Sequence, residues 1–175
     1  ANVSAPSGTT MYLLLENMGR INYGPGLYDY KGLHMKPPLP GNWTAHCLPL
    51  DIEGIRNLAW NDAESVAAPL KEPVFRRGYL EVASGAVADT FLDTRGLSKG
   101  HAWINGHHLG RYWETAGPQH TLYIPASFLV EGSNEVIILD LHGSSVNSIA
   151  FVDQPRYPQQ HWARKKASKL KDDSE

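Results

Sequence analysis

Short apolar or alternating runs recur along the chain, and Gly, Pro, Asn or Asp bounds each run. A spacing of about ten residues between such runs is typical of antiparallel strands joined by turns. The pattern therefore predicts an all-β fold, an antiparallel β-sandwich or jelly roll. The expected strands are Met11–Leu15, Trp43–Leu48, Val74–Val82, Thr90–Asp93, His101–Ile104, Leu109–Trp113, Thr121–Ile124, Glu135–Leu141 and Ser148–Val152.

Helical patterns are few and short. Ile52, Ile55 and Leu58 recur at three-residue intervals and predict a short helix within residues 51–60, although Gly54 weakens it. Pro suits the entry of a helix, so Pro125–Leu129 is expected to form a single helical turn. The prediction is thus a β-sandwich with one or two short helical turns.

One tight hairpin is marked by Asn105-Gly106, which lies between two strand-like runs. Both residue types tolerate the positive φ angles of a type I′ turn. The sequence therefore predicts that residues 101–104 and 109–113 pair as an antiparallel hairpin.

The chain is expected to divide into four parts. Residues 1–60 are read as part of a first β-domain, or as N-terminal strands packed on the sandwich, and residues 73–155 as the jelly roll itself. The Ala-rich, weakly patterned stretch 61–72 is typical of a linker or long loop. The basic C-terminal tail 156–175 is either a docking segment for an acidic partner or a solvated extension.

Charge and composition exclude several classes. The 175 residues have a formal net charge of −2, and because the tail contributes +3, the remaining residues carry −5. A nucleic-acid binder shows the opposite bias, so none is expected. No run of eighteen apolar residues exists, so no membrane span is predicted. The first residues lack the charged and apolar regions of a signal peptide.

Cysteine usage and glycosylation signals are sparse. A single cysteine, Cys47, excludes an internal disulfide, and its apolar surroundings predict a buried, inert thiol. Two sequons, at Asn2 and Asn42, are possible glycosylation sites that permit secretion without showing it.

Catalytic and metal chemistry has no strong candidate. The carboxylates of Asp51 and Glu53 fit surface roles better than a glycosidase pair. His107 and His108 are adjacent, so on a strand they face opposite sides and do not share an ion. No Gly-x-Ser-x-Gly or Gly-Lys-Ser/Thr motif is present. We expect no catalytic residue, no metal site and no cofactor.

Aromatic side chains near polar ones leave carbohydrate binding open, because sugars stack on aromatic rings and bond to Asn and Arg. The alternative is structural: strand alternation aims Trp103 and Tyr112 from opposite hairpin arms into the sandwich core. The candidate carbohydrate-binding residues are Arg20, Tyr23, Trp103, Asn105, Arg111 and Trp113.

Ordered motifs over residues 11–155 resemble the non-catalytic β region of glycoside hydrolase family 35 β-galactosidases. The motifs are Leu14-Leu15-Glu16-Asn17-Met18-Gly19-Arg20-Ile21-Asn22-Tyr23-Gly24, Asp93-Thr94-Arg95-Gly96-Leu97-Ser98-Lys99-Gly100-His101-Ala102-Trp103-Ile104-Asn105-Gly106, Leu109-Gly110-Arg111-Tyr112-Trp113, Leu122-Tyr123-Ile124-Pro125 and Phe151-Val152-Asp153-Gln154-Pro155.

The resemblance implies a galactose-binding-like jelly roll. Family members place their catalytic glutamates on a TIM barrel, which 175 residues do not hold beside these strands. The implied function is a non-catalytic C-terminal β-domain chain that supports hydrolysis of terminal β-galactosides by a separate TIM-barrel chain. The resemblance also implies a lysosomal or secreted location.

Two alternatives stay open. One is a free-standing, lectin-like module that binds galactosides or other glycans, since a fold name by itself does not prove sugar binding. The other is a structural subunit recruited into a larger assembly through the jelly-roll surface and the basic tail.

Overall fold

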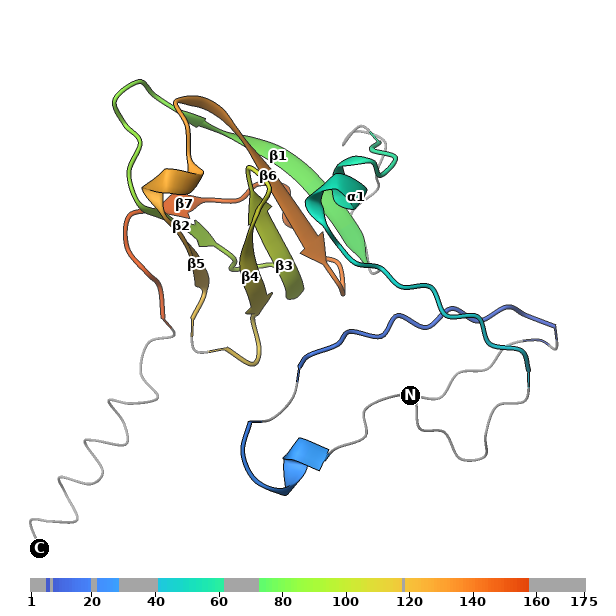
Figure 1. Ribbon diagram of the computed structural model, residues 1–175. Coiled ribbons are helices and arrows are strands. Elements are labelled where there is room, and N and C mark those ends of the chain that lie inside the picture. Colours follow the sequence, from blue (N-terminus) through green and yellow to red (C-terminus); the bar gives the residue numbers. More distant parts are fainter. Residues whose placement is uncertain are drawn as a thin grey trace, which may run out of the picture. The chain divides into compact units, whose positions relative to one another are not determined.

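A computed structural model of the chain describes residues 6, 8–19, 22–28, 41–61, 73–117 and 119–157. Two compact units are present, residues 1–48 and residues 49–175 (Figure 1). The predicted linker beyond Asn61 and the predicted tail beyond Tyr157 lie outside the described residues. Among the described helices, none is both long and apolar enough to cross a membrane.

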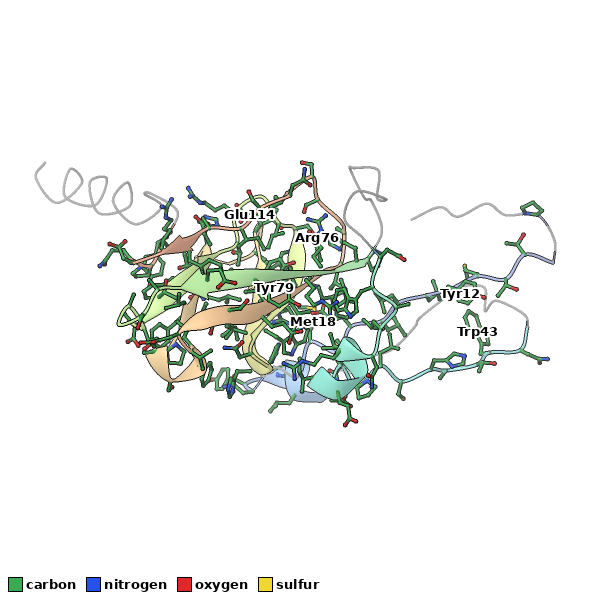
Figure 2. The ribbon with its side chains drawn as sticks, turned by 90° about the horizontal axis from the view of Figure 1, so that it is seen from above. Tyr12, Met18, Trp43, Arg76, Tyr79 and Glu114 are labelled. Carbon is green, nitrogen blue, oxygen red and sulfur yellow. The ribbon has the colours of Figure 1, made fainter. Side chains whose placement is uncertain are left out.

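The first unit contains one short 3₁₀ helix, η1 (Pro25–Tyr28), and no strand among its described residues. The strands predicted at 11–15 and 43–48 are therefore wrong. The side chains of Tyr12 and Trp43, labelled in Figure 2, are 89% and 52% exposed. An extended segment becomes a strand only when a neighbour accepts and donates its backbone hydrogen bonds, and no such neighbour pairs with these segments in the described structure.

Cys47 departs from the sequence prediction for the same reason. Its thiol is exposed, whereas an apolar strand would have buried it. The expectation of a buried, inert thiol is wrong, because the local run of apolar residues has no sheet to pack against in the described structure.

The second unit confirms the predicted all-β fold. Two antiparallel sheets form it, one with strand order β1-β6-β3-β4 and one with order β5-β2-β7 (Figure 1). The predicted strand 148–152 is shorter than expected, since only its last two residues pair as a strand. The strands are β1 (Val74–Val82), β2 (Thr90–Asp93), β3 (Lys99–Ile104), β4 (His107–Trp113), β5 (Thr121–Ile124), β6 (Gly132–Asp140) and β7 (Phe151–Val152).

The main core lies on one face of the four-stranded sheet, which we call the inner face, where side chains of both sheets meet. Alternation along β6 places Val136 and Ile138 there, and both are almost fully buried. The buried members are Leu92, Leu97, Ala102, Ile104, Tyr112, Leu122, Ile124, Leu129, Val136 and Ile138.

A smaller cluster covers the opposite, outer face. It contains Trp103, Ile137 and Leu139, and the five-residue helix α1 (Ile52–Arg56) closes it with Ile55. The Asp51 carboxylate caps this helix by accepting a 2.7 Å hydrogen bond from the Gly54 N–H.

The two helical predictions are confirmed in type and shortened in length. The helix expected within 51–60 ends at Arg56, and a single 3₁₀ turn, η3 (Ala126–Phe128), follows Pro125. The Asp89 carboxylate holds that turn by accepting hydrogen bonds from the Ala126 N–H and the Tyr123 hydroxyl. These bonds lower the pKa of Asp89, the Tyr123 bond most of all.

Candidate functional site

The β3–β4 hairpin carries four of the predicted site residues, and its turn has the predicted geometry. Asn105 and Gly106 have φ angles of 47° and 86°, and Ile104 pairs with His107 across the turn. Positive φ at both central residues is the mark of a type I′ turn. The predicted hairpin is confirmed.

The Asn105 side chain braces this turn against the rest of the sandwich. Its amide donates to the Phe128 carbonyl at 2.8 Å and to Asn134 Oδ1 at 2.7 Å. Its Oδ1 atom accepts from the Glu135 N–H at 2.9 Å. All of these partners are atoms of the protein itself, so Asn105 has a structural role. Its amide has little remaining capacity to hydrogen-bond a sugar hydroxyl.

Asn134 is the centre of that network and was missed in the sequence. It is fully buried, and its amide donates to the carbonyls of Val130, Gly132 and Leu80. Its Oδ1 accepts from the Val130 N–H. The Gly132-Ser133-Asn134 turn was a local signal for the bonds to Val130 and Gly132, but the Leu80 carbonyl lies 54 residues away in sequence.

The two hairpin aromatics are both buried, each with 4% of its surface exposed, but on opposite faces. Tyr112 enters the inner core as predicted, whereas Trp103 lies in the outer cluster beneath α1. The prediction that both point into the same core is wrong for Trp103, because α1 covers the outer face and buries this side chain there. Burial of Trp103 removes its ring from contact with a soluble ligand.

The Tyr112 side chain extends over Gly100 of the neighbouring strand β3, and its hydroxyl donates a 2.8 Å hydrogen bond to the Leu139 carbonyl of β6. A Cβ atom on Gly100 would lie 1.7 Å from that carbonyl oxygen and 2.9 Å from the hydroxyl. Burial raises the pKa of the Tyr112 phenol, so it stays a neutral donor. Glycine is required here for close packing.

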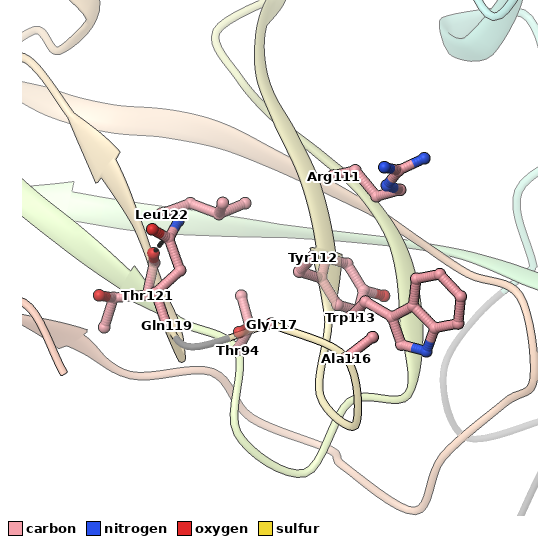
Figure 3. A pocket seen from close by; sticks show the side chains of 9 residues that line it. All are labelled: Thr94, Arg111, Tyr112, Trp113, Ala116, Gly117, Gln119, Thr121 and Leu122. Atoms are coloured by element: carbon pink, nitrogen blue, oxygen red, sulfur yellow. Dashed lines mark hydrogen bonds between the residues drawn. The ribbon is translucent and has the colours of Figure 1, made fainter. Parts of the chain in front are cut away.

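A shallow cavity of about 240 Å³ opens where the end of β4 approaches β5. Figure 3 shows Arg111 and Trp113 on one side, and Gln119 and Thr121 on the other. The volume lies below the range of about 300–1,000 Å³ typical of small-molecule pockets. The residues that line it are Thr94, Arg111, Tyr112, Trp113, Ala116, Gly117, Gln119, Thr121 and Leu122.

Polar side chains around this cavity already bond to protein atoms. The Thr94 hydroxyl donates to the His120 carbonyl, and the Gln119 amide donates to the Thr121 carbonyl, the dashed line in Figure 3. The Thr121 hydroxyl accepts from the Arg156 N–H. These bonds tie the β4–β5 loop to its neighbours, and they reduce the capacity to bind sugar hydroxyls.

Trp113 is half-buried, and a cation covers one face of its indole ring. The Lys99 ammonium stands over its ring at 4.0 Å from the centroid, a cation–π contact. The Arg111 side chain is exposed, and in Figure 3 its guanidinium points away from Gln119 and Thr121. The two residues line one cavity, but their polar groups do not converge in it.

The remaining predicted residues lie elsewhere. Tyr23 belongs to the first unit and is 86% exposed, while Arg20 and Asn2 lie outside the described residues. Asn42 is exposed, as a glycosylation site requires. Of the five carbohydrate candidates that the structure describes, it brings together only Arg111 and Trp113 at one cavity.

Carboxylates take structural roles. Asp93 is buried and pairs with the Arg95 guanidinium at 2.7 Å and that of Arg156 at 3.7 Å. Burial raises the pKa of Asp93, but the bonds and charges of the two arginines outweigh burial and lower it. In the described part of the chain, no three His, Cys, Asp or Glu side chains cluster as metal ligands.

Two family models match the chain. Residues 1–48 match the first all-beta domain of beta-galactosidase, and residues 73–134 match the beta-galactosidase galactose-binding domain. The second match covers strands β1 to β5 and the start of β6. The second match agrees with the observed sandwich, whereas the described part of residues 1–48 contains no strand.

Curated relatives match most of the chain. Beta-galactosidase of Bos taurus is 35% identical over 88% of the chain, beta-galactosidase 8 of Oryza sativa subsp. japonica 31% over 89%, and beta-galactosidase 1 of Dictyostelium discoideum 35% over 90%. The matches cover 27%, 28% and 24% of those proteins. The chain thus spans about a quarter of the length of these relatives.

The ordered hairpin motifs, the two β-domain matches and the similarity over almost nine-tenths of the chain all agree. The chain therefore carries β-domains that match the non-catalytic β-domains of glycoside hydrolase family 35 β-galactosidases.

Proposed function

We propose that this chain is a non-catalytic β-domain chain that supports hydrolysis of terminal β-galactosides by a separate TIM-barrel chain. The observation that carries the proposal is that the matched regions are β-domains and cover about a quarter of each relative. In the relatives, the remaining length accompanies these domains in one polypeptide. The proposal assigns the role of partner to the part of the relatives that these domains do not cover.

Exposed apolar side chains in the first unit support a partner of this kind. Tyr12, Leu15 and Leu48 are 89%, 65% and 64% exposed, and Trp43 is 52% exposed. Such a concentration of large apolar side chains within 48 residues is typical of surfaces that another chain covers. The proposed partner surface is therefore apolar and presents backbone groups that extended segments can pair with.

Co-expression with the catalytic barrel of a relative tests the proposal. The barrel is expected to co-purify with this chain, and its thermal inactivation is expected to slow at least severalfold. The isolated chain is expected to show no galactosidase turnover. A matched pair of variants sharpens the test: Tyr12→Ser should weaken association, whereas Tyr79→Ser, 62% exposed on β1 in the second unit, should not. A stable monomer that never associates with the barrel would overturn the proposal.

A lysosomal or secreted location belongs to the same proposal. Its support is the resemblance to the family and the exposed Asn42 in an Asn-Trp-Thr sequon. Expression in a secretory host should give a glycan at this residue that Asn42→Gln removes, seen as a mass difference. Intact mass without any glycan would count against passage of this segment through the secretory route.

Carbohydrate binding is the second candidate, favoured by the cavity that Arg111, Trp113 and Gln119 line. Its polar groups are largely engaged, so we expect weak binding of galactosides. Titration with galactose and glucose, followed by NMR shifts of the Trp113 indole N–H, tests it. Arg111→Ala, which keeps the Trp113 probe, should abolish any galactose response, whereas Trp60→Phe, distant in sequence, should keep it. No response at saturating sugar would exclude this candidate.

A further inference from the structure

Two imidazoles meet across the β3–β4 hairpin, outside the groups that the proposed function uses. His101 Nδ1 lies 3.0 Å from His108 Nε2, and the ring centroids are 5.1 Å apart. His101 is partly buried and His108 is exposed, so an ion from solvent reaches the pair. The sequence motif His107-His108 concealed this geometry, because the partner of His108 lies seven residues earlier.

Strand register places the pair on one face. His108 lies opposite Trp103, and His101 precedes Trp103 by two residues, so all three side chains point outward. The Trp103 ring is 5.1 Å from the His108 ring and 6.1 Å from the His101 ring, centroid to centroid. Because Trp103 is held beneath α1, it gives both imidazoles a rigid support.

We propose that His101 and His108 form a two-nitrogen binding site for a Cu²⁺-class divalent ion. At metal–nitrogen distances of about 2.0–2.1 Å, two ligands at a right angle have nitrogens about 2.9 Å apart, and a tetrahedral angle separates them by about 3.3 Å. The observed 3.0 Å is a hydrogen-bond distance in the metal-free pair, and it is also close to the spacing that a right angle at a square-planar ion requires. Water supplies the other positions.

The ligand types favour copper over harder ions. Imidazole suits Cu, Ni and Zn, and Cu²⁺ has the highest affinity among the first-row divalent ions. The cross-strand partners of the two histidines are Arg111, Leu139 and Trp103, and none of these side chains has a carboxylate. Ca²⁺ and Mg²⁺ require such oxygen ligands and are not expected to bind at this pair.

Each imidazole binds a metal through a ring nitrogen that carries no proton. In the neutral pair one N–H points at the other nitrogen. When an ion replaces that hydrogen bond, the proton moves to the second nitrogen of the same ring through solvent, and the pair loses no proton.

Titration of the tag-free full chain with CuCl₂ at neutral pH tests the site, with Trp fluorescence and electron paramagnetic resonance as readouts. Copper at the pair is expected to quench Trp103 and to give a spectrum with two nitrogen ligands. His108→Phe keeps an aromatic ring beside Trp103 but removes the nitrogen, and it should weaken binding at least about tenfold.

The matched control is His107→Ala. This neighbouring imidazole stacks on Phe128 with centroids 4.0 Å apart and is not part of the pair, so copper affinity should be unchanged. His101→Ala provides a second loss-of-ligand variant, and a urea titration confirms that each variant is folded. Equal copper affinity in wild type, His101→Ala and His108→Phe would overturn the proposal.

Discussion

The two faces of the four-stranded sheet are built from alternating residues of the same strands, yet they are closed differently. A second sheet covers the inner face, where Ile138 is 1% exposed. A five-residue helix covers part of the outer face, where Ile137 is also 1% exposed. Beyond that helix the outer face carries the His101–His108 pair and the Lys99–Trp113 contact.

The difference shows where the domain is free to bind. On the inner face buried polar groups bond mainly to protein atoms, as the Tyr112 hydroxyl does at the Leu139 carbonyl, although Asp140 Oδ2 has no such partner in the described structure. On the outer face a small cover buries Trp103 and leaves neighbouring polar side chains accessible. The inner face therefore serves packing, whereas the outer face is the one whose polar side chains a ligand can reach.

The largest effect is expected from Gly100→Ala on the inner face. The added methyl group would lie 1.7 Å from the Leu139 carbonyl oxygen, so β3 and β6 must separate. We expect a loss of more than about 4 kcal/mol in the free energy of unfolding, measured by urea titration. Gly78→Ala is the control, because its Cβ would meet no atom within 4 Å. Equal stability of the two variants would contradict the inner-face packing.

The pair Ile138→Ala and Ile137→Ala compares the faces directly. Both residues are 1% exposed on β6, so each change removes the same atoms from a buried site. We expect a cost of about 4 kcal/mol for Ile138 and about 2–3 kcal/mol for Ile137, since a five-residue helix relaxes into the cavity more easily than a sheet. A larger cost at Ile137 would show that α1 closes its face as firmly as the second sheet does.

Removal of the helix cap should have a smaller effect, confined to the outer face. Asp51→Ala leaves the Gly54 N–H without its acceptor and should cost about 1 kcal/mol. Asp51→Asn should recover most of this loss, because an amide oxygen also accepts the bond. Hydrogen exchange is expected to rise in α1 and to stay unchanged at Ile138; exchange that rose equally at both would contradict a separate outer cover.

The smallest effect is expected from pH. The pKa of His108 lies below its ordinary 6.5 because of burial and His101. As pH falls below about 6.5, the unfolded chain takes up a proton before the folded chain does, so stability declines toward the lowered pKa. His108→Phe should flatten this decline in urea titrations at stepwise lower pH, whereas His107→Ala should keep it. An unchanged slope in His108→Phe would assign the decline to other groups.

The sequence predicted the hairpin and most strands of the second unit, because alternation and Asn105-Gly106 are local signals. It failed at residues 11–15 and 43–48, where apolar runs look like strands but pair with no described neighbour. It also failed for the face of Trp103. Local pattern reports that a residue is buried, but not which layer buries it.

The candidate site was less predictable. A two-residue turn at Asn105-Gly106 already brings His108 opposite Trp103, so the face shared with His101 could have been found in the sequence. The register shift between Ala102 and Trp103 could not have been found in the sequence. This shift decides the separation of the two imidazoles. Nor does any local signal link Asn134 to the Leu80 carbonyl, 54 residues away.

The sequence by itself determined the family resemblance and, in the second unit, most antiparallel strands and their turns, since these follow from local spacing and ordered motifs. Only the tertiary structure decided which residues are free for chemistry. It placed Asn105 and Trp103 in structural roles, left Arg111 and Trp113 at one cavity, and joined His101 to His108. The reason is physical: accessibility and contact between side chains depend on which segments cover each face, and those segments lie far apart in the chain.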